Sequence, residues 1–378
     1  MKKTSFWKKP VVQTLLTSLL CIVIGLLIGY IALLIIAPEG ATEAITTIIL
    51  NFMSRGTKVA RLKTLGNTLI KTAPLMMCAL SVCFCYKVGL FNIGVAGQYV
   101  AGAGMSLACA LILQLPWYVC ILAAALGGAV LGAISGALKA YRNVNEVISG
   151  IMLNWITLYL VNMVLSNPVA KESTSPYTVN IQAVNENGLI PSAGLGALFA
   201  NNRNVTIAIP IAIIIAIIIW VVLDKTKFGY ELKATGFNKD SAKYAGMKEK
   251  KNIIVTLAIG GALAGLGAAF MYLTGYMKWE TTQASIPSMG FNGIAATFLG
   301  GLHPIGTIFS SFFIQNITDG GSLIDRMLYP SQISDLISGI IIYLCGFVLF
   351  FKYLLSKSKA KQAQDDNANA EVKGGDDK

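Results

Sequence analysis

The segment TLLTSLLCIVIGLLIGYIALLII, residues 14–36, runs for 23 residues without a charged side chain. A helix needs about 20 largely apolar residues to cross the hydrocarbon core of a bilayer, so this segment is long enough to span a membrane. Four lysines precede it, as in a signal peptide, but the apolar run is too long and no small-residue cleavage site follows it. We therefore expect a retained transmembrane helix whose N-terminal end lies in the cytoplasm.

The same pattern recurs along the chain. Of the 378 residues, 55% are hydrophobic and 13% are charged, and the mean hydropathy of +0.65 is well above that of a typical soluble protein. Further apolar runs occupy residues 72–86, 117–138, 147–165, 205–223, 253–276 and 333–355. The first of these spans only if it begins near Leu65. The formal charge of +12 fits basic cytoplasmic loops, so no nucleic-acid partner is expected.

The region 290–321, GFNGIAATFLGGLHPIGTIFSSFFIQNITDGG, is apolar but interrupted. Gly300, Gly301 and Pro304 divide it, so we expect two half-length elements or a broken helix. If both termini lie inside, the number of crossings is even, and this region must then cross twice. The predicted fold is an all-α polytopic membrane protein with about ten transmembrane elements, including broken or half-length helices.

Loop charges orient these spans. Residues 224–252 contain eight lysines and four acids, a net charge of +4, which is typical of a cytoplasmic loop. Residues 166–203 carry no net charge and are expected outside; the same topology places the basic loop 38–63 outside as well. We predict one transmembrane domain over residues 1–356 and a disordered cytoplasmic tail over residues 357–378, with both termini inside.

The chain lacks the residue combinations that enzymes need. It has one histidine, His303, and no G-x-x-x-x-G-K-[ST] motif, which excludes a relay of two histidines and a P-loop on this chain. We expect His303 to bond to local backbone rather than to gate a pathway. The seven cysteines lie in or beside apolar runs and are interpreted as buried hydrophobic residues, so we expect no metal site and no cofactor.

Small residues recur four apart in two segments. Gly128, Gly132 and Gly136 share one helical face, and Gly261 and Gly265 share another. Such faces let helix backbones approach closely where lipid provides no hydrophobic drive for association. We favour packing within one bundle over a dimer face.

The basic loop 224–252 contains the signals of a short helix. Asn238 is a suitable N-cap, Asp240 lies in the first turn and Gly246 is a C-terminal stop, which predicts about two turns between Asn238 and Ala245. The helix could dock a cytoplasmic partner, or the loop could simply be solvated. The residues alone slightly favour the second interpretation.

The stretch FNIGVAGQYVAGAG, residues 91–104, is polar at its start and rich in glycine. The glycines permit a broken helix start, and Asn92 and Gln98 offer amide donors and acceptors to a hydrated route. Equally, these amides could satisfy broken backbone or join helices. Asn154 and Trp155 form a second cluster, which either meets a solute or packs within the bundle.

Five blocks of the chain, taken together, resemble one family. They are FNIGVAGQ (91–98), KAYRNVNEVISGIMLNWI (139–156), KATGFNKDSAKYAGMK (233–248), GGALAGLGAA (260–269) and GFNGIAATFLGGLHPIG (290–306). In this order they are similar to permease subunits of bacterial ABC importers, in the branch that includes nucleoside, simple-sugar and branched-chain amino-acid permeases. The resemblance covers residues 65–350 and is closest to the nucleoside importer permeases.

The resemblance implies a translocation pathway for nucleosides or a related neutral polar solute, in the bacterial cell membrane. Candidate pathway residues are Phe91, Asn92, Gln98, Asn154, Trp155 and Asn292. The coupling loop implies a docking surface for a cytoplasmic ATP-binding subunit, which would hold ATP and Mg, at Gly236, Asn238, Asp240, Ala242, Tyr244, Ala245 and Gly246. Further expected partners are a second permease that is a different chain, and an extracytoplasmic binding protein or lipoprotein.

Two differences from the nucleoside-type pattern leave the identity of the solute undecided. Nucleoside-type blocks often have Glu where this chain has Ala96, and Asp where it has Asn292. The absence of both charges fits a pathway for a neutral solute, since a buried unpaired charge is costly. Alternatives are an ABC permease for simple sugars or branched-chain amino acids, and a secondary transporter of a small polar solute that works without ATP. The secondary transporter leaves the capped cytoplasmic helix unexplained.

Overall fold

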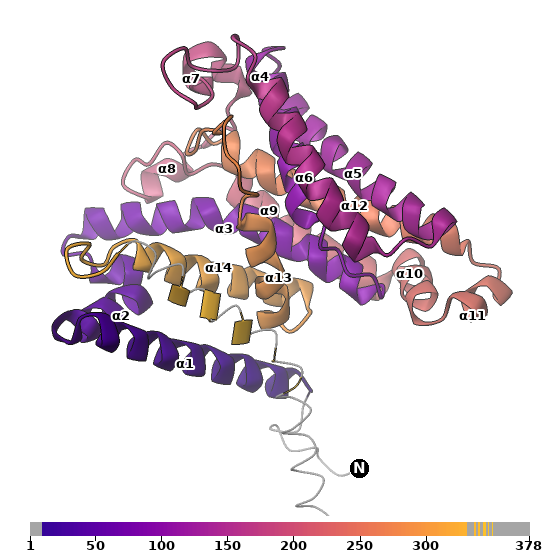
Figure 1. Cartoon of the computed structure of the whole chain (residues 1–378), viewed down its shortest axis with the longest axis horizontal. Helices are drawn as coiled ribbons and strands as arrows, with labels where there is room; N and C mark the ends of the chain where they lie inside the picture. The colour runs from indigo at the N-terminus through magenta and orange to yellow at the C-terminus, as the bar shows by residue number, and fades with distance from the viewer. Residues whose placement is uncertain are drawn as a thin grey trace, which may run out of the picture.

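The computed structural model describes residues 10–330 and positions 336, 337, 339, 340, 343, 344, 347 and 350. Within these residues the regular elements are all helices, arranged as a bundle (Figure 1). Six of them are long and apolar enough to cross a membrane: α1 (Pro10–Ile36), α3 (Lys58–Lys87), α5 (Trp117–Arg142), α6 (Glu146–Leu165), α9 (Ala208–Lys225) and α12 (Glu249–Tyr272). The predicted all-α polytopic membrane fold is confirmed.

Three shorter helices complete the membrane part that the structure describes: α4 (Val95–Leu111), α13 (Met289–Leu299) and α14 (Pro304–Gly321). The region 290–321 is broken where expected, and the Nδ1 atom of His303 accepts a hydrogen bond from the backbone N–H of Ile305 at 3.2 Å to cap α14. α13 is about 16 Å long, roughly half of the hydrocarbon thickness. With its 18 residues α14 is a full-length helix, so only one of the two elements is half-length.

The segment 38–63 was expected to be a loop, and this prediction is wrong. It contains a 3-10 turn (Pro38–Gly40), the helix α2 (Ala41–Leu50), a second 3-10 turn η3 (Asn51–Ser54) and the beginning of α3. α3 starts at Lys58, and the Thr57 hydroxyl caps it by accepting a hydrogen bond from the Ala60 N–H at 3.2 Å. Of the basic residues in this segment, Lys58, Arg61 and Lys63 are exposed on the first turns of α3, and Arg55 precedes the helix. Most of the last expected span, 333–355, lies outside the described residues.

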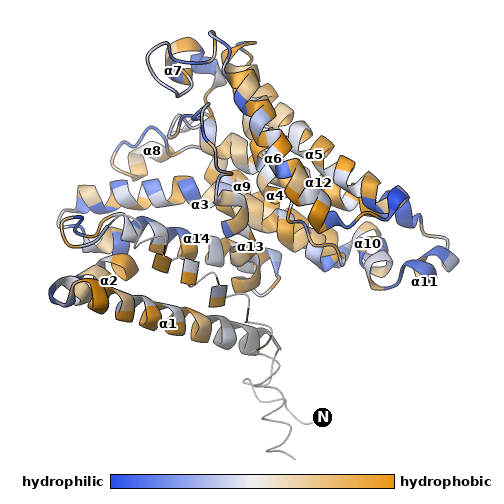
Figure 2. Cartoon of the chain, viewed as in Figure 1, coloured by the Kyte–Doolittle hydropathy of each residue, from blue (hydrophilic) through white to orange (hydrophobic). Residues whose placement is uncertain are grey.

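α3 connects the two polar ends of the bundle. Near its start, the side chain of Asn202 donates a hydrogen bond to Asn67 Oδ1 at 2.8 Å, which brings the segment 166–203 to this end. Just past its other end, Val88 packs against Gly236 in the segment 224–252. The two contacts are 21 residues apart along α3, so the two segments lie about 32 Å apart at opposite ends of the bundle, as the topology predicted. Figure 2 shows hydrophilic residues around α7 (Ile181–Val184) and α8 (Leu195–Leu198) at one end and around α11 (Lys239–Tyr244) at the other.

The two small-residue faces pack against each other between α5 and α12. A methyl group on Gly128 would overlap the carbonyl oxygen of Gly261, and one on Gly261 would overlap that of Gly128. Backbone therefore meets backbone, which only glycine allows. The prediction of packing within one bundle is confirmed.

Six of the seven cysteines lie in the described part of the chain. All six are buried and none is in a disulfide. Cys83 and Cys85 are both fully buried on α3. They serve there as small hydrophobic residues, as predicted.

Candidate functional site

The turn between α3 and α4 carries the first candidate pair. Asn92 is 3% exposed and Gln98 is 1% exposed. The Asn92 amide donates to Gln98 Oε1 at 2.8 Å and to Ser81 Oγ at 3.1 Å, and Gln98 donates back to Asn92 Oδ1 at 3.1 Å. The two amides thus satisfy each other and join the start of α4 to α3. Their contact with a solute stays a prediction.

Asn154 holds α6 against the same turn. Its Oδ1 accepts a hydrogen bond from the Gly97 N–H at 2.7 Å, and its amide donates to the Ile93 carbonyl at 3.2 Å. The first N–H groups of a helix have no partner within the helix, so this side chain completes the start of α4. Its buried position agrees with a structural role and leaves a pathway role untested.

Trp155 and Phe91 contact other aromatic rings rather than the amides. Trp155 is 41% exposed, and its ring stacks on Tyr159 of the same helix with 6.3 Å between ring centroids. It therefore points away from the amides, toward the outer surface of this chain. Phe91 is half-buried and meets Tyr86 edge-on at 6.5 Å.

α13 begins inside the bundle beside α4. The non-helical segment that precedes it starts at the 166–203 end, where the Leu273 carbonyl accepts a hydrogen bond from the Ile190 N–H at 2.9 Å. Gly290 packs against the backbone of Ala96, whereas Asn292, about half a turn further along α13, is half-buried. Ala96 is fully buried, so a glutamate would find no room there without a shift of the backbone.

The structure thus gathers Asn92, Gln98 and Asn154 around the start of α4, and all three side chains are neutral amides. It does not bring Asn292 into this network, and Trp155 turns outward. The three amides can offer hydrogen bonds to a neutral solute only if helices separate, because they are occupied in this conformation.

The helix predicted in the basic loop is present as α11. Asn238 Oδ1 accepts a hydrogen bond from the Ser241 N–H at 3.0 Å, and Gly246 ends the segment with φ +78°, a conformation that disfavours side chains. Ala242 is buried, whereas Asp240, Ala245 and Gly246 are exposed. Tyr244 is 95% exposed, so its ring projects from the protein.

A second helix, α10 (Lys227–Phe237), mounts α11 on the bundle and was not anticipated. Asn252 of α12 donates a hydrogen bond to Thr235 Oγ1 at 2.8 Å, and Gly236 fits against the turn at Val88, where a methyl group would overlap the Val88 carbonyl. Gly236 therefore fixes α10 in place. The sequence interpretation missed Phe237, which is 94% exposed; an aromatic residue beside an N-cap was the available signal.

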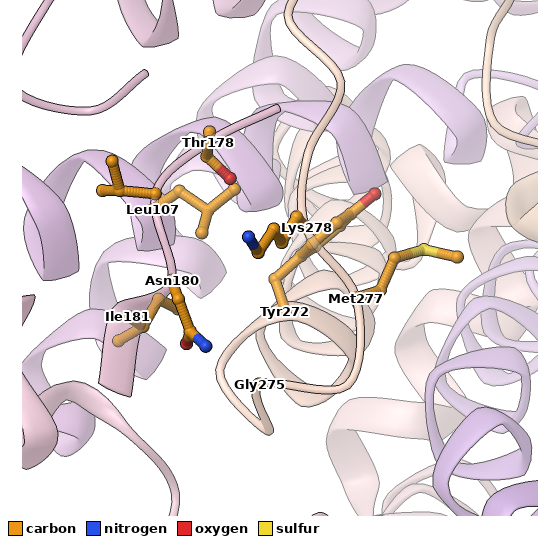
Figure 3. Close-up of a pocket in the computed structure, with 9 residues that line it drawn as sticks. Leu107, Thr178, Asn180, Ile181, Tyr272, Gly275, Met277 and Lys278 are labelled. Atoms are coloured by element: carbon orange, nitrogen blue, oxygen red, sulfur yellow. The ribbon is translucent and has the colours of Figure 1, made fainter. Parts of the chain in front are cut away.

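The opposite end of the bundle contains a small cavity, shown in Figure 3, with room for about one water molecule. It is therefore far too small to enclose a nucleoside. Its lining residues come from α4, from the segment 178–181 and from the end of α12: Leu107, Thr178, Val179, Asn180, Ile181, Tyr272, Gly275, Met277 and Lys278. It does not include any predicted pathway residue.

The sequence interpretation also missed an ion pair between α3 and α14. Lys71 Nζ of α3 lies 2.8 Å from Asp319 Oδ1 of α14. The two residues are 248 positions apart, so no local pattern links them. Their side chains are 25% and 9% exposed, which places the pair largely out of solvent.

Comparison with known proteins identifies the family. The family described as "Branched-chain amino acid transport system / permease component" matches residues 64–346. The chain belongs to this family. It is therefore a permease component of an ABC importer, a multi-pass protein of the plasma membrane and not itself an enzyme. This excludes the secondary transporter.

Named relatives share most of the chain. It is 32% identical to the nucleoside ABC transporter permease protein NupB of Lactococcus lactis subsp. cremoris, over 93% of this chain and 96% of NupB. It is 30% identical to the guanosine ABC transporter permease protein NupP of Bacillus subtilis, over 79% of this chain and 85% of NupP. The glucose ABC transporter permease protein TsgB13 of Haloferax volcanii is 27% identical, over 82% of this chain and 83% of TsgB13. No solved structure matches.

Proposed function

We propose that this permease imports nucleosides. The observation that carries the proposal is the likeness to NupB, which extends over nearly the full length of both chains. The three neutral amides around the start of α4, Asn92, Gln98 and Asn154, support it, because amides can donate to and accept from both a base and a sugar. Import of a sugar or a branched-chain amino acid is the competing proposal, supported by TsgB13 and by the family description.

Uptake competition tests the substrate. The permease is expressed with its ATPase and binding protein in cells that lack other nucleoside uptake, and accumulation of labelled uridine is measured. Unlabelled guanosine should compete, whereas ribose, glucose and leucine should not. Competition by glucose or leucine with no effect of guanosine would move the assignment to another branch of the family.

The α10–α11 end is proposed to dock the cytoplasmic ATP-binding subunit, which would carry ATP and Mg. The net charge of +4 over residues 224–252 supports a cytoplasmic location. Phe237 at the end of α10 and Tyr244 at the end of α11 support docking, since two nearly fully exposed aromatic rings suit insertion into a partner's groove. Both termini of the chain would lie on this same side.

Copurification tests the docking surface. Changing both Phe237 and Tyr244 to Ser should release the ATPase in mild detergent while the permease stays folded, because neither ring packs within the chain. Changing Tyr177 to Ser is the matched control, since this aromatic is also exposed but lies at the other end of the bundle. Retention of the ATPase by the double variant would place the docking surface elsewhere.

A second permease subunit and an external binding protein complete the proposed assembly. Trp155 supports the second subunit: it adjoins Asn154 but faces outward, so a pathway that includes both residues needs another chain to close it. We expect that chain to be different from this one. Mass measurement of the intact complex distinguishes two different permeases from two copies.

A further inference from the structure

Three buried side-chain atoms in the described part of the chain lack a hydrogen-bond partner. They are Asn51 Oδ1, Ser311 Oγ and Asp319 Oδ2. All three lie where α14, α3 and η3 meet: Ser311 and Asp319 are two turns apart on α14, and the Asn51 amide bonds to Thr68 of α3 and Asn316 of α14. Buried polar groups normally have partners, so this concentration in one seam requires an explanation.

Asp319 is the strongest hydrogen-bond acceptor of these three residues. The residue is 7% exposed. Its Oδ1 accepts hydrogen bonds from Lys71 Nζ at 2.8 Å and from Gln315 Nε2 at 2.9 Å, whereas Oδ2 accepts none from the described residues. One oxygen is thus fixed in place and the other is left as a positioned acceptor.

An aromatic ring lies beside Lys71, the ion-pair partner of this carboxylate. Lys71 Nζ is 5.5 Å from the ring centroid of Tyr276, which is half-buried. Tyr276 belongs to the segment that leads from α12 to the start of α13, where the neutral amides gather. The bond between Asn67 and Asn202 places the seam toward the 166–203 end of the bundle. The carboxylate and the ring therefore lie toward the side from which an imported solute would arrive.

We propose that Asp319 recognises the ribose hydroxyls of the incoming nucleoside through Oδ2. Lys71 and Gln315 act as positioning residues for the carboxylate, and Tyr276 offers a flat face to the sugar or base. Acidic side chains are suited to this task because a carboxylate accepts hydrogen bonds from vicinal hydroxyls, as at dinucleotide ribose sites. The inference rests on the proposed nucleoside function and names the residue that selects the sugar.

Competition between uridine and 2′,3′-dideoxyuridine tests this inference. The wild-type complex should prefer uridine, because a buried acceptor left unpaired by the dideoxy sugar costs binding free energy. In Asp319→Asn the preference should fall by about tenfold or more, since the charged acceptor is replaced by a neutral amide. The same ratio is measured in Glu146→Gln as the control, because Glu146 pairs with Lys139 at 2.7 Å between α5 and α6.

The outcomes separate recognition from a purely structural ion pair. An unchanged preference in Asp319→Asn, or equal loss of both solutes together with a lower melting temperature, overturns the inference. A wild type without any preference for uridine also overturns it. If Asp319→Asn does not fold, Gln315→Met leaves the ion pair in place and should show a smaller loss of the same preference. If the wild type takes up neither uridine nor guanosine, the nucleoside function itself fails.

Discussion

The seam between α5 and α12 differs sharply from the seam between α3 and α14. In the first, Gly128 and Gly261 bring backbone against backbone. In the second, Lys71, Gln315 and Asp319 form charged and amide contacts, and two α14 atoms have no partner in the described residues. The α5–α12 seam is thus packed backbone against backbone, whereas the α3–α14 seam contains buried polar atoms without a hydrogen-bond partner among the described residues.

The contrast indicates which part of the bundle can open. Helices in lipid gain little from the hydrophobic effect when they associate, so tight backbone contact and polar bonds stabilise the bundle. Separating α5 from α12 would lose close packing and gain nothing. Separating α3 from α14 would expose polar groups that water or a solute can satisfy. We therefore expect α5 and α12 to stay packed together, and α3 and α14 to be the helices that separate.

The largest expected effect is at Gly128. In Gly128→Leu the new side chain must displace the backbone of α12, which should cost more than the about 1–3 kcal/mol that is typical of overpacked cores. We expect little or no folded permease in detergent extracts, measured by size-exclusion chromatography. Val130→Leu is the control, because Val130 is exposed on the same helix. Normal yield of Gly128→Leu would show that this seam is not rigid.

The next largest effect is expected on stability at the ion pair of Lys71 and Asp319, where removing one charge should differ from removing both. Lys71→Met leaves Asp319 buried without its cation, and loss of one partner from a buried ion pair typically costs about 3–5 kcal/mol. Replacing both residues, Lys71→Met with Asp319→Leu, should restore much of the stability, because an apolar pair can substitute for buried charges. Thermal unfolding of the purified variants measures both. Equal melting temperatures for the single and double variants would contradict a buried pair.

The sequence predicted the fold where the signal is local. Apolar runs gave most of the spans, Gly300 and Pro304 gave the break before α14, and Asn238 with Gly246 gave α11. The start of α3 was missed because its first turns carry exposed basic residues, and the cap at Thr57 is a single weak signal. α2 was missed because it lies in a segment whose charges suggested a loop.

The sequence could predict which residues belong to the candidate site but not which of them bond to one another. Asn92 and Gln98 were recognised as amides in an apolar element, yet their bond to each other depends on the sharp turn at residues 91–94. Lys71 and Asp319 meet only through the packing of α3 on α14, which no sequence spacing reveals. The exposure of Phe237 follows from how α10 is braced against Val88, again a tertiary contact.

A smaller effect is expected at the amide pair. Asn92→Leu or Gln98→Leu removes two mutual hydrogen bonds, and hydrogen bonds between membrane helices are worth on the order of 0.6 kcal/mol each. The double variant should cost little more than Asn92→Leu alone, since both of these bonds of Gln98 are to Asn92, whereas Asn92 also bonds to Ser81. Melting temperature and uptake are measured on the same preparations. Lost uptake with unchanged stability would assign the amides to the pathway, and lost stability with proportionate uptake would assign them to helix joining.

The smallest effect is expected at a second ion pair, which lies in solvent. Lys278 Nζ is 2.5 Å from Glu172 Oε1 and joins the segment 166–203 to the segment that leads to α13. The hydrogen bond from Lys278 lowers the pKa of Glu172. A carboxyl whose pKa is lower in the folded state stabilises the fold above its unfolded pKa, and this contribution is lost as the pH falls through the folded value. Any difference in melting temperature between wild type and Glu172→Gln should therefore be present at neutral pH and vanish below about pH 4.

Salt should separate this pair from the buried one. Exposed ion pairs contribute little and are screened, so raising the ionic strength should erase the small effect of Glu172→Gln. The same salt should leave the difference between Lys71→Met and wild type nearly intact, because Asp319 is buried. The two segments also remain joined in Glu172→Gln, since the Thr178 N–H donates to the Trp279 carbonyl at 2.9 Å and the Trp279 N–H donates to Thr178 Oγ1 at 3.1 Å. A large, salt-resistant loss in Glu172→Gln would mean that this pair, too, is shielded from water in the assembled importer.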